Sequence, residues 1–181
     1  MNGTGLWISV ESQSVYPTAA YAAKKTAKAK GMTHQGRAAS KGEAALFRAF
    51  VEEVFNQGKV EAASKYFTPD FVDHDGFPGK EPNLRGFQEG LREFHKAFPG
   101  LRGELEQVVA SGDKVVAYGA FTGRHEGAFM GAPPTGREFR VKFVDIVRFK
   151  GGKIAEHWGV FDSGALLEQL GFQLAPPVPS R

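Results

Sequence analysis

The stretch from Arg137 to Asp162 most constrains what this chain can fold into. It contains two runs typical of β-strands, joined by a Gly151-Gly152 pair that favours a tight hairpin turn. Alternate side chains of a strand face opposite sides of a sheet. One alternate set of the first run is largely apolar and has a single carboxylate in its middle: Arg137, Phe139, Val141, Phe143, Asp145, Val147 and Phe149. The sequence therefore predicts a long hairpin with Asp145 inside an apolar sheet face.

A carboxylate on such a face needs a partner or a proton, because an unpaired buried charge is costly. Asp145 is therefore either satisfied by a neighbour or held with a raised pKa for proton transfer. An ion pair with Arg124, Arg140 or Arg148 is the structural alternative to a catalytic role. Parity alone does not decide which face of the hairpin meets a cavity.

Length and composition narrow the class of protein. The 181 residues suffice for one domain with its own core, and the 16 Phe make that core unusually aromatic. The absence of Cys excludes disulfides, thiolate metal sites and cysteine nucleophiles. No apolar run approaches the roughly 20 residues that span a bilayer. We therefore expect a cytoplasmic protein with no membrane partner.

The net charge of +3 is unevenly distributed along the chain. Residues 1–41 carry six basic and one acidic side chain, which leaves 17 basic and 19 acidic side chains for residues 42–181. The part expected to fold is therefore not basic, and we expect no nucleic-acid partner. We interpret residues 1–40 as an N-terminal extension outside the core fold, with a basic amphipathic tail or a targeting segment as alternatives.

The rest of the chain separates its helices from its strands. Apolar residues recur at helical spacing in three segments, 41–57, 60–67 and 83–98, with one short strand at 71–76. Period-two segments follow at 101–110 and 114–126, then the hairpin, a last helix from Ser163 and a Pro-rich tail at 173–181. This order predicts an α+β domain over 41–172. We expect a cone-shaped half-barrel of curved antiparallel sheet, with the three helices covering a hydrophobic pocket.

Several short segments resemble one known family in an unbroken order. They are DHD at 73–75, FPG at 98–100, GRHEGAFMGAPPTGREF at 123–139, VDIVRFKGGKIAEHW at 144–158 and FD at 161–162. Together they resemble the SnoaL-like polyketide cyclases of the nuclear-transport-factor-2-like superfamily, over roughly residues 43–171. The ordered set is specific for fold and family and much less specific for the reaction.

The resemblance implies a deep pocket for a small hydrophobic molecule, and a homodimer. It also implies closure of a polyketide ring by intramolecular aldol condensation, without metal or cofactor. The family's general acid/base is an Asp, and Asp145 is the matching position. His74 and His157 stand at the family's usual histidine positions, and His125 matches its Gly-x-His-x-Gly-like stretch. We therefore take Asp145, His157 and His125 as candidate catalytic residues.

The aldol reaction needs a base for the proton next to a carbonyl and an acid for the new alkoxide. One carboxylate in a dry pocket can serve as both if its pKa rises toward neutrality. A neutral His157 or His125 could donate to the enolate oxygen, and Phe139, Phe143 and Trp158 could supply an apolar wall. The expected substrate-binding residues are His74, Tyr118, Arg124, Phe129, Met130, Phe143 and Trp158.

Other interpretations remain beside these. Phe129 and Met130 could form a lid over the cavity or a dimer contact. His74 lies between Asp73 and Asp75, as in some metal sites, but adjacent residues of a strand cannot all face one ion, so we expect no metal. A non-catalytic module that binds small hydrophobic ligands or dimerises is the alternative to an enzyme.

Overall fold

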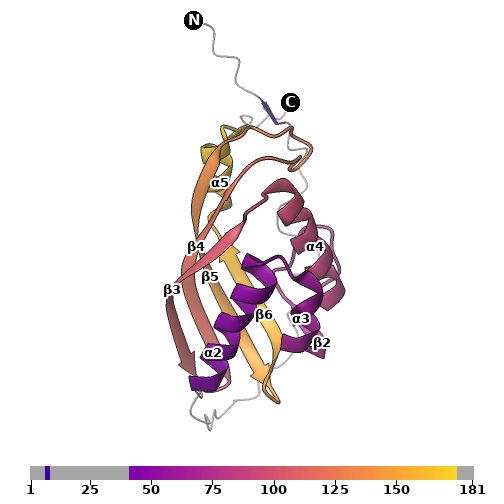
Figure 1. Ribbon diagram of the computed structural model, residues 1–181, viewed down its shortest axis with the longest axis vertical. Coiled ribbons are helices and arrows are strands. Elements are labelled where there is room, and N and C mark those ends of the chain that lie inside the picture. Colours follow the sequence, from indigo (N-terminus) through magenta and orange to yellow (C-terminus); the bar gives the residue numbers. More distant parts are fainter. Residues whose placement is uncertain (1–6, 9–40, 175–181) are drawn as a thin grey trace, which may run out of the picture.

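The computed structural model describes residues 7–8 and 41–174 (Figure 1). Helices come first, as α2 (Lys41–Phe50) with its π-helical continuation η1 (Val51–Asn56), the 3-10 turn η2 (Val60–Ala62), α3 (Ala63–Tyr66) and α4 (Leu84–Ala97). The strands are β2 (Phe67–Asp73), β3 (Arg102–Ser111), β4 (Lys114–Arg124), β5 (Glu138–Lys150) and β6 (Lys153–Phe161), followed by α5 (Ser163–Leu170). This segregation confirms the predicted α+β class.

The helices begin and pack as their sequences dictate. Asn83 caps α4, since its side chain accepts a hydrogen bond from Gly86 N at 3.1 Å. The apolar stripe of α2 and η1 points into the core, where Phe47 and Val54 are almost fully buried.

No helix among the described residues is long and apolar enough to cross a membrane.

The five main strands form one sheet in the order β2-β6-β5-β4-β3. The four strands from β3 to β6 are antiparallel neighbours, as predicted. The edge strand differs from the prediction, because β2 begins already at Phe67, includes Pro69 and runs parallel to β6. Proline is tolerated there because an edge strand leaves one row of backbone groups unpaired.

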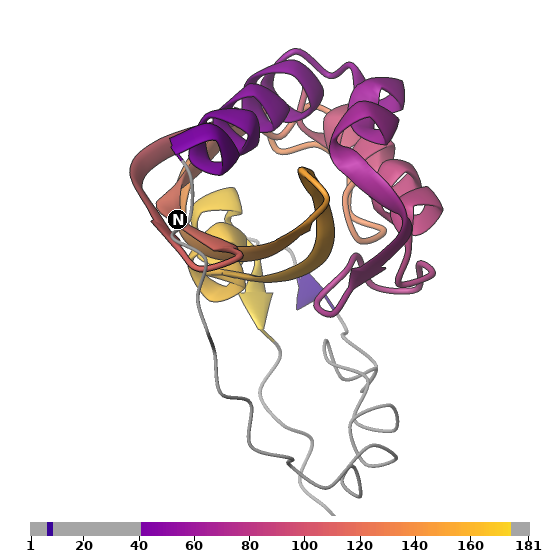
Figure 2. The same ribbon diagram turned by 90° about the horizontal axis from the view of Figure 1, so that it is seen from below.

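The sheet is curved, and helices α2, α3 and α4 lie across one side of it (Figure 2). We call this side the inner face and the opposite side the outer face. The alternate set that contains Asp145 lies on the inner face, where Phe139, Phe143 and Val147 are buried in the core. Register shifts in β3 and at the end of β5 add to the curvature. The structure therefore shows that the strand face with Asp145 is the one that meets the interior, which the sequence alone did not decide.

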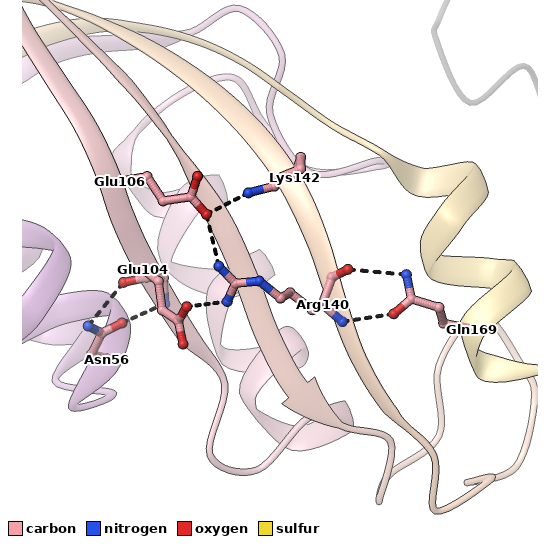
Figure 3. Close-up of polar contacts among 7 residues, drawn as sticks. Asn56, Glu104, Glu106, Arg140, Lys142 and Gln169 are labelled. Atoms are coloured by element: carbon pink, nitrogen blue, oxygen red, sulfur yellow. Dashed lines mark hydrogen bonds and ion pairs between the residues drawn. The ribbon is translucent and has the colours of Figure 1, made fainter.

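Two amide side chains continue the sheet's hydrogen bonding at one end (Figure 3). The pairing of β5 with β6 stops at Phe143, so the backbone of Arg140 lies beyond β6. The Gln169 amide of α5 takes over, accepting from Arg140 N at 2.8 Å and donating to Arg140 O at 3.1 Å. Asn56 does the same for Gly103 on the β3 edge, at 2.7 and 3.3 Å. These contacts fix the end of the sheet against η1 and α5.

A second, short pairing joins the two ends of the described chain. Strand β1 (Trp7–Ile8) lies parallel to β7 (Gln173–Leu174). Trp7 and Ile8 belong to the segment interpreted from the sequence as an N-terminal extension. The remaining residues of the 1–40 extension and residues 175–181 lie outside the described residues, so the division into extension, domain and tail stays a prediction.

Candidate active site

Three side chains from three strands meet on the inner face. In the sheet register Asp73 of β2 lies beside His157 of β6, and Asp145 of β5 lies beside Gly159 of β6. The His157 ring bridges the two acids: Nδ1 lies 2.9 Å from Asp73 Oδ1, and Nε2 lies 3.3 Å from Asp145 Oδ1. The Asp73 side chain is only 3% exposed, whereas those of His157 and Asp145 are 21% and 20% exposed. We call Asp73, His157 and Asp145 the triad.

The two carboxylates that contact the His157 imidazole determine its charge. Burial by itself lowers the pKa of His157, but the hydrogen bonds and negative charges of Asp145 and Asp73 outweigh it and raise the pKa from 6.5 to about 10. His157 is therefore an imidazolium at neutral pH and donates from both ring nitrogens. The neutral His157 expected from the sequence is thus wrong for this arrangement, although its position beside Asp145 is as expected.

Gly159 lets Asp145 and His157 pack directly against the β6 backbone. A Cβ atom at this position would lie 2.7 Å from both Asp145 Oδ1 and His157 Nε2. The backbone there does not require glycine, because the φ of Gly159 lies outside the left-handed region. The missing side chain is thus what allows Asp145 and His157 to meet at this point of the inner face.

Aromatic rings continue the inner face beside the triad. Phe143 and Phe161 are cross-strand neighbours, one step along the same face from Asp145 and Gly159. Phe121 stacks on Phe143 with ring centroids 4.2 Å apart, and Phe94 of α4 approaches Phe161 at 6.4 Å. Phe161 remains 38% exposed, which for an inner-face Phe indicates incomplete filling of the interior. Flat, apolar ligands suit such a surface.

Three predicted substrate-binding residues lie on the outer face instead. Tyr118 pairs with Val144, and Trp158 pairs with Ile146, so both point away from Asp145. The His74 ring stacks on Trp158 at 4.5 Å, and its Nε2 lies 2.9 Å from Glu156 Oε2. The structure therefore does not bring these residues to the triad, and it removes Trp158 from the expected apolar wall.

His125 also lies in a different place from Asp145. It follows Arg124, which pairs with Glu138, and Asp145 is further along β5 by about 23 Å at roughly 3.3 Å per residue. The His125 ring is buried, accepts from Thr135 N at 3.2 Å and packs 5.5 Å from Phe98. Burial lowers its pKa. His125 thus ties the 125–136 loop to the core, and the structure gives it no contact with the triad.

The remaining candidates cluster with this loop. Phe129 packs on Phe98 with ring centroids 4.9 Å apart, Met130 is 51% exposed, and Arg124 donates to Gly136 O at 2.8 Å. A surface hollow of about 570 Å³ lies at this end, lined by Pro99, Gly100, Thr122, Gly123, Arg124, Glu138, Phe139, Arg140 and Gln169. Whether Phe129 and Met130 act as a lid or a dimer contact stays a prediction.

The structural alternative for Asp145, an ion pair with one of three arginines, is wrong. Arg124 pairs with Glu126, Arg140 with Glu104 and Glu106, and Arg148 with Glu156. Asp145 has His157 as its partner. The carboxylates around His74 also diverge, since Asp73 faces His157 while Asp75 accepts from Gly159 N at 3.3 Å.

Sequence reasoning missed Asp73 as a functional candidate. The signal available was its place in the DHD segment, but Asp73 and His157 are far apart in the chain. Only the parallel pairing of β2 with β6 brings them together.

Comparison with known proteins agrees with this fold. The SnoaL-like polyketide cyclase family model matches residues 45–170. Nogalonic acid methyl ester cyclase of Streptomyces nogalater is 32% identical over 129 residues, which cover 65% of this chain and 89% of that protein. Aklanonic acid methyl ester cyclase DauD of Streptomyces sp. (strain C5) is 29% identical over 142 residues, which cover 71% and 87%.

Solved structures give the same result. TsrD from Streptomyces laurentii superposes with a TM-score of 0.66 at 28% identity, covering 73% of this chain and 97% of that one. Wild-type IdmH from Streptomyces antibioticus has a TM-score of 0.63 at 29% identity, covering 71% and 98%. With the family model matched over most of the α+β domain, this chain belongs to the SnoaL-like polyketide cyclase family.

Proposed function

We propose that this protein closes a ring in a small aromatic polyketide ester by intramolecular aldol condensation, with the acid–base chemistry of Asp145 and His157. The observation that supports the proposal most is the contact of Asp145 Oδ1 with His157 Nε2, on an inner face rich in phenylalanine. The two relatives named above are cyclases of nogalonic and aklanonic acid methyl esters, which suggests methyl esters of this kind as substrates.

The reaction can be written with these two side chains. The Asp145 carboxylate takes a proton from the carbon next to a carbonyl, and His157 Nε2–H donates a hydrogen bond to the enolate oxygen that forms. The enolate carbon then bonds to a second carbonyl carbon of the same molecule. That carbonyl becomes an alkoxide, which takes the proton from His157 Nε2.

The site can return to its starting state without solvent. After ring closure Asp145 carries the proton from carbon and His157 is neutral. Transfer of that proton from Asp145 to His157 Nε2, along the contact that joins them at 3.3 Å, restores both groups. Substrate and product are therefore isomers of equal mass, and the substrate needs an acidic C–H and an electrophilic carbonyl within one molecule.

Conversion of a methyl ester to a product of equal mass tests the proposal. We expect purified protein to convert nogalonic or aklanonic acid methyl ester into a ring-closed isomer, which chromatography with mass detection separates from the ester. Saturable binding of both esters without an isomeric product would contradict it and favour the non-catalytic binding module.

We also propose that the protein forms a homodimer through its outer face. Apolar side chains form two neighbouring rows across the sheet there: Val109, Val116, Ile146 and Trp158 in one row, and Tyr118, Val144 and Val160 in the other. Val109 and Val160 are more than half exposed. The charges at the end of this face, such as Arg140 with Glu104 and Glu106, are already paired within the chain. A second copy of the same face could cover these rows in a two-fold arrangement.

Sedimentation velocity tests the dimer. We expect wild type to sediment as a dimer and the double variant Val116→Lys/Val160→Lys as a monomer, because each lysine would be buried unpaired at the interface. Met130→Lys changes an exposed apolar side chain in the 125–136 loop, the other candidate dimer contact, and should leave the dimer intact if the outer face forms the interface. A monomeric wild type, or a double variant that still dimerises, would overturn this interface. The cytoplasmic location stays a prediction.

A further inference from the structure

Asp73 is the one member of the triad that a substrate cannot readily reach. It ends β2, its side chain is 3% exposed, and its backbone N–H donates to Pro82 O at 3.1 Å. Gly76 closes the turn above it so tightly that a Cβ atom there would lie 3.2 Å from Asp73 Oδ2. Asp73 therefore acts on the reacting groups only through His157.

The contact with Asp73 fixes which atoms of His157 carry protons. A carboxylate only accepts hydrogen bonds, so Nδ1 must donate to Asp73 Oδ1 across 2.9 Å. A neutral ring would then present an unprotonated Nε2 to the carboxylate of Asp145, placing two acceptors 3.3 Å apart. Only the imidazolium satisfies both carboxylates at once.

The charged groups around the His157 ring also favour the imidazolium. Asp73 contributes from β2 and Asp145 from β5, while Asp75 in the turn after β2 is bound to Gly159 N. His74 and Glu156 pair with each other on the outer face. Phe94 is the α4 side chain that approaches the neighbouring Phe161, and it carries no charge. Removal of the Asp73 charge would leave His157 and Asp145 to share one proton in a 1:1 pair.

We infer that Asp73 is a positioning residue, which holds His157 as a cationic donor with Nε2–H on Asp145, so that Asp145 remains the base and His157 the acid. This inference rests on the proposed function. Without the Asp73 charge, the proton shared by the remaining pair can settle on Asp145, which would then no longer be a base. A buried ion pair that only stabilises the sheet is the alternative explanation, and it makes no statement about proton position.

The variant Asp73→Asn separates these explanations. The Asn carbonyl can still accept from Nδ1–H, so the ring orientation is kept while the charge is removed. We expect the titration of His157, followed through its ring ¹⁵N signals in ligand-free protein, to move to lower pH. We also expect kcat to fall about 100-fold with little change in KM, and the alkaline limb of the pH–rate profile to move to lower pH.

Asp75→Asn is the matched control. It makes the same change two residues further on, in the turn after β2, but its carboxylate binds the Gly159 backbone and not the imidazole. It should leave the His157 titration and the alkaline limb unchanged. If the His157 titration and the alkaline limb of the pH–rate profile are unchanged in Asp73→Asn, the positioning role is wrong, whatever the stability of the variant.

The test of Asp73 still gives an answer if the protein is not a cyclase or if the variant does not fold. The titration needs no substrate, so a lowered titration without any turnover would support the role of Asp73 and count against the cyclase function alone. If Asp73→Asn does not fold, the wild-type ring signals decide: protons on both ring nitrogens at pH 8 support the inference, and a neutral ring overturns it.

Discussion

Asp145→Asn should lose nearly all turnover while keeping its fold. The amide carbonyl can still accept from His157 Nε2–H, so the contact that now measures 3.3 Å is preserved, but an amide cannot take a proton from carbon. We expect kcat to fall by about 10³-fold, the middle of the range for removal of a general base. Thermal unfolding and ligand affinity should change little. Steady-state kinetics measure kcat, and a binding titration on the same preparations measures ligand affinity.

Asp70→Asn provides the matched control for this change. Asp70 lies on β2, is 64% exposed and pairs with Lys150 at 2.8 Å, so it loses the same charge far from the inner face. Its turnover should equal that of wild type. Full activity in Asp145→Asn would remove Asp145 from the chemistry and leave the triad as a structural ion-pair network.

Gly159→Ala should have the second largest effect. A methyl group there would lie 2.7 Å from both Asp145 Oδ1 and His157 Nε2, well inside van der Waals contact, so base and acid must move apart. Displacements of about 1 Å in a catalytic pair cost about 100-fold in rate. The loss should appear in kcat, because the methyl group disrupts the contact between the two reacting side chains.

Gly164→Ala is the control, which tests whether replacement of a glycine elsewhere also lowers activity. Gly164 lies in α5, where a Cβ atom would be 3.6 Å from Asp162 Oδ1, an ordinary contact. Alanine there should leave activity unchanged and should slightly stabilise the helix. Wild-type activity in Gly159→Ala would show that turnover does not need the close contact of Asp145 with His157.

Much of the fold could be predicted from local patterns. The alternation from Arg137 to Phe149 indicated the strand and the side chains that share a face with Asp145, because the side-chain period of a strand is independent of its partners. Which face meets the interior was decided only by the structure. The Asn83 cap and the Gly151-Gly152 turn are local signals as well. The edge strand was less predictable, because the Pro69 within β2 favours a break while the parallel pairing with β6 that overrides it is long-range.

The site was predictable only in part for the same reason. Asp145 and His157 lie on one hairpin, so a short-range register brings them together. Asp73 reaches His157 only through β2, and its role depends on that tertiary contact. Trp158 belongs to a segment that resembles the family but lies on the outer face, because motif identity does not specify which side of the sheet a residue occupies.

Reaction in deuterated water tests the central claim most directly. Wild type and Asp145→Asn are incubated side by side with nogalonic acid methyl ester, and deuterium at the carbon next to the reacting carbonyl is followed by NMR and mass spectrometry. Proton abstraction by Asp145 predicts rapid exchange at that carbon and formation of the ring-closed isomer with wild type, and neither above background with the variant. Ester that binds wild type but gains no deuterium and no ring, or equal exchange in both proteins, would contradict it.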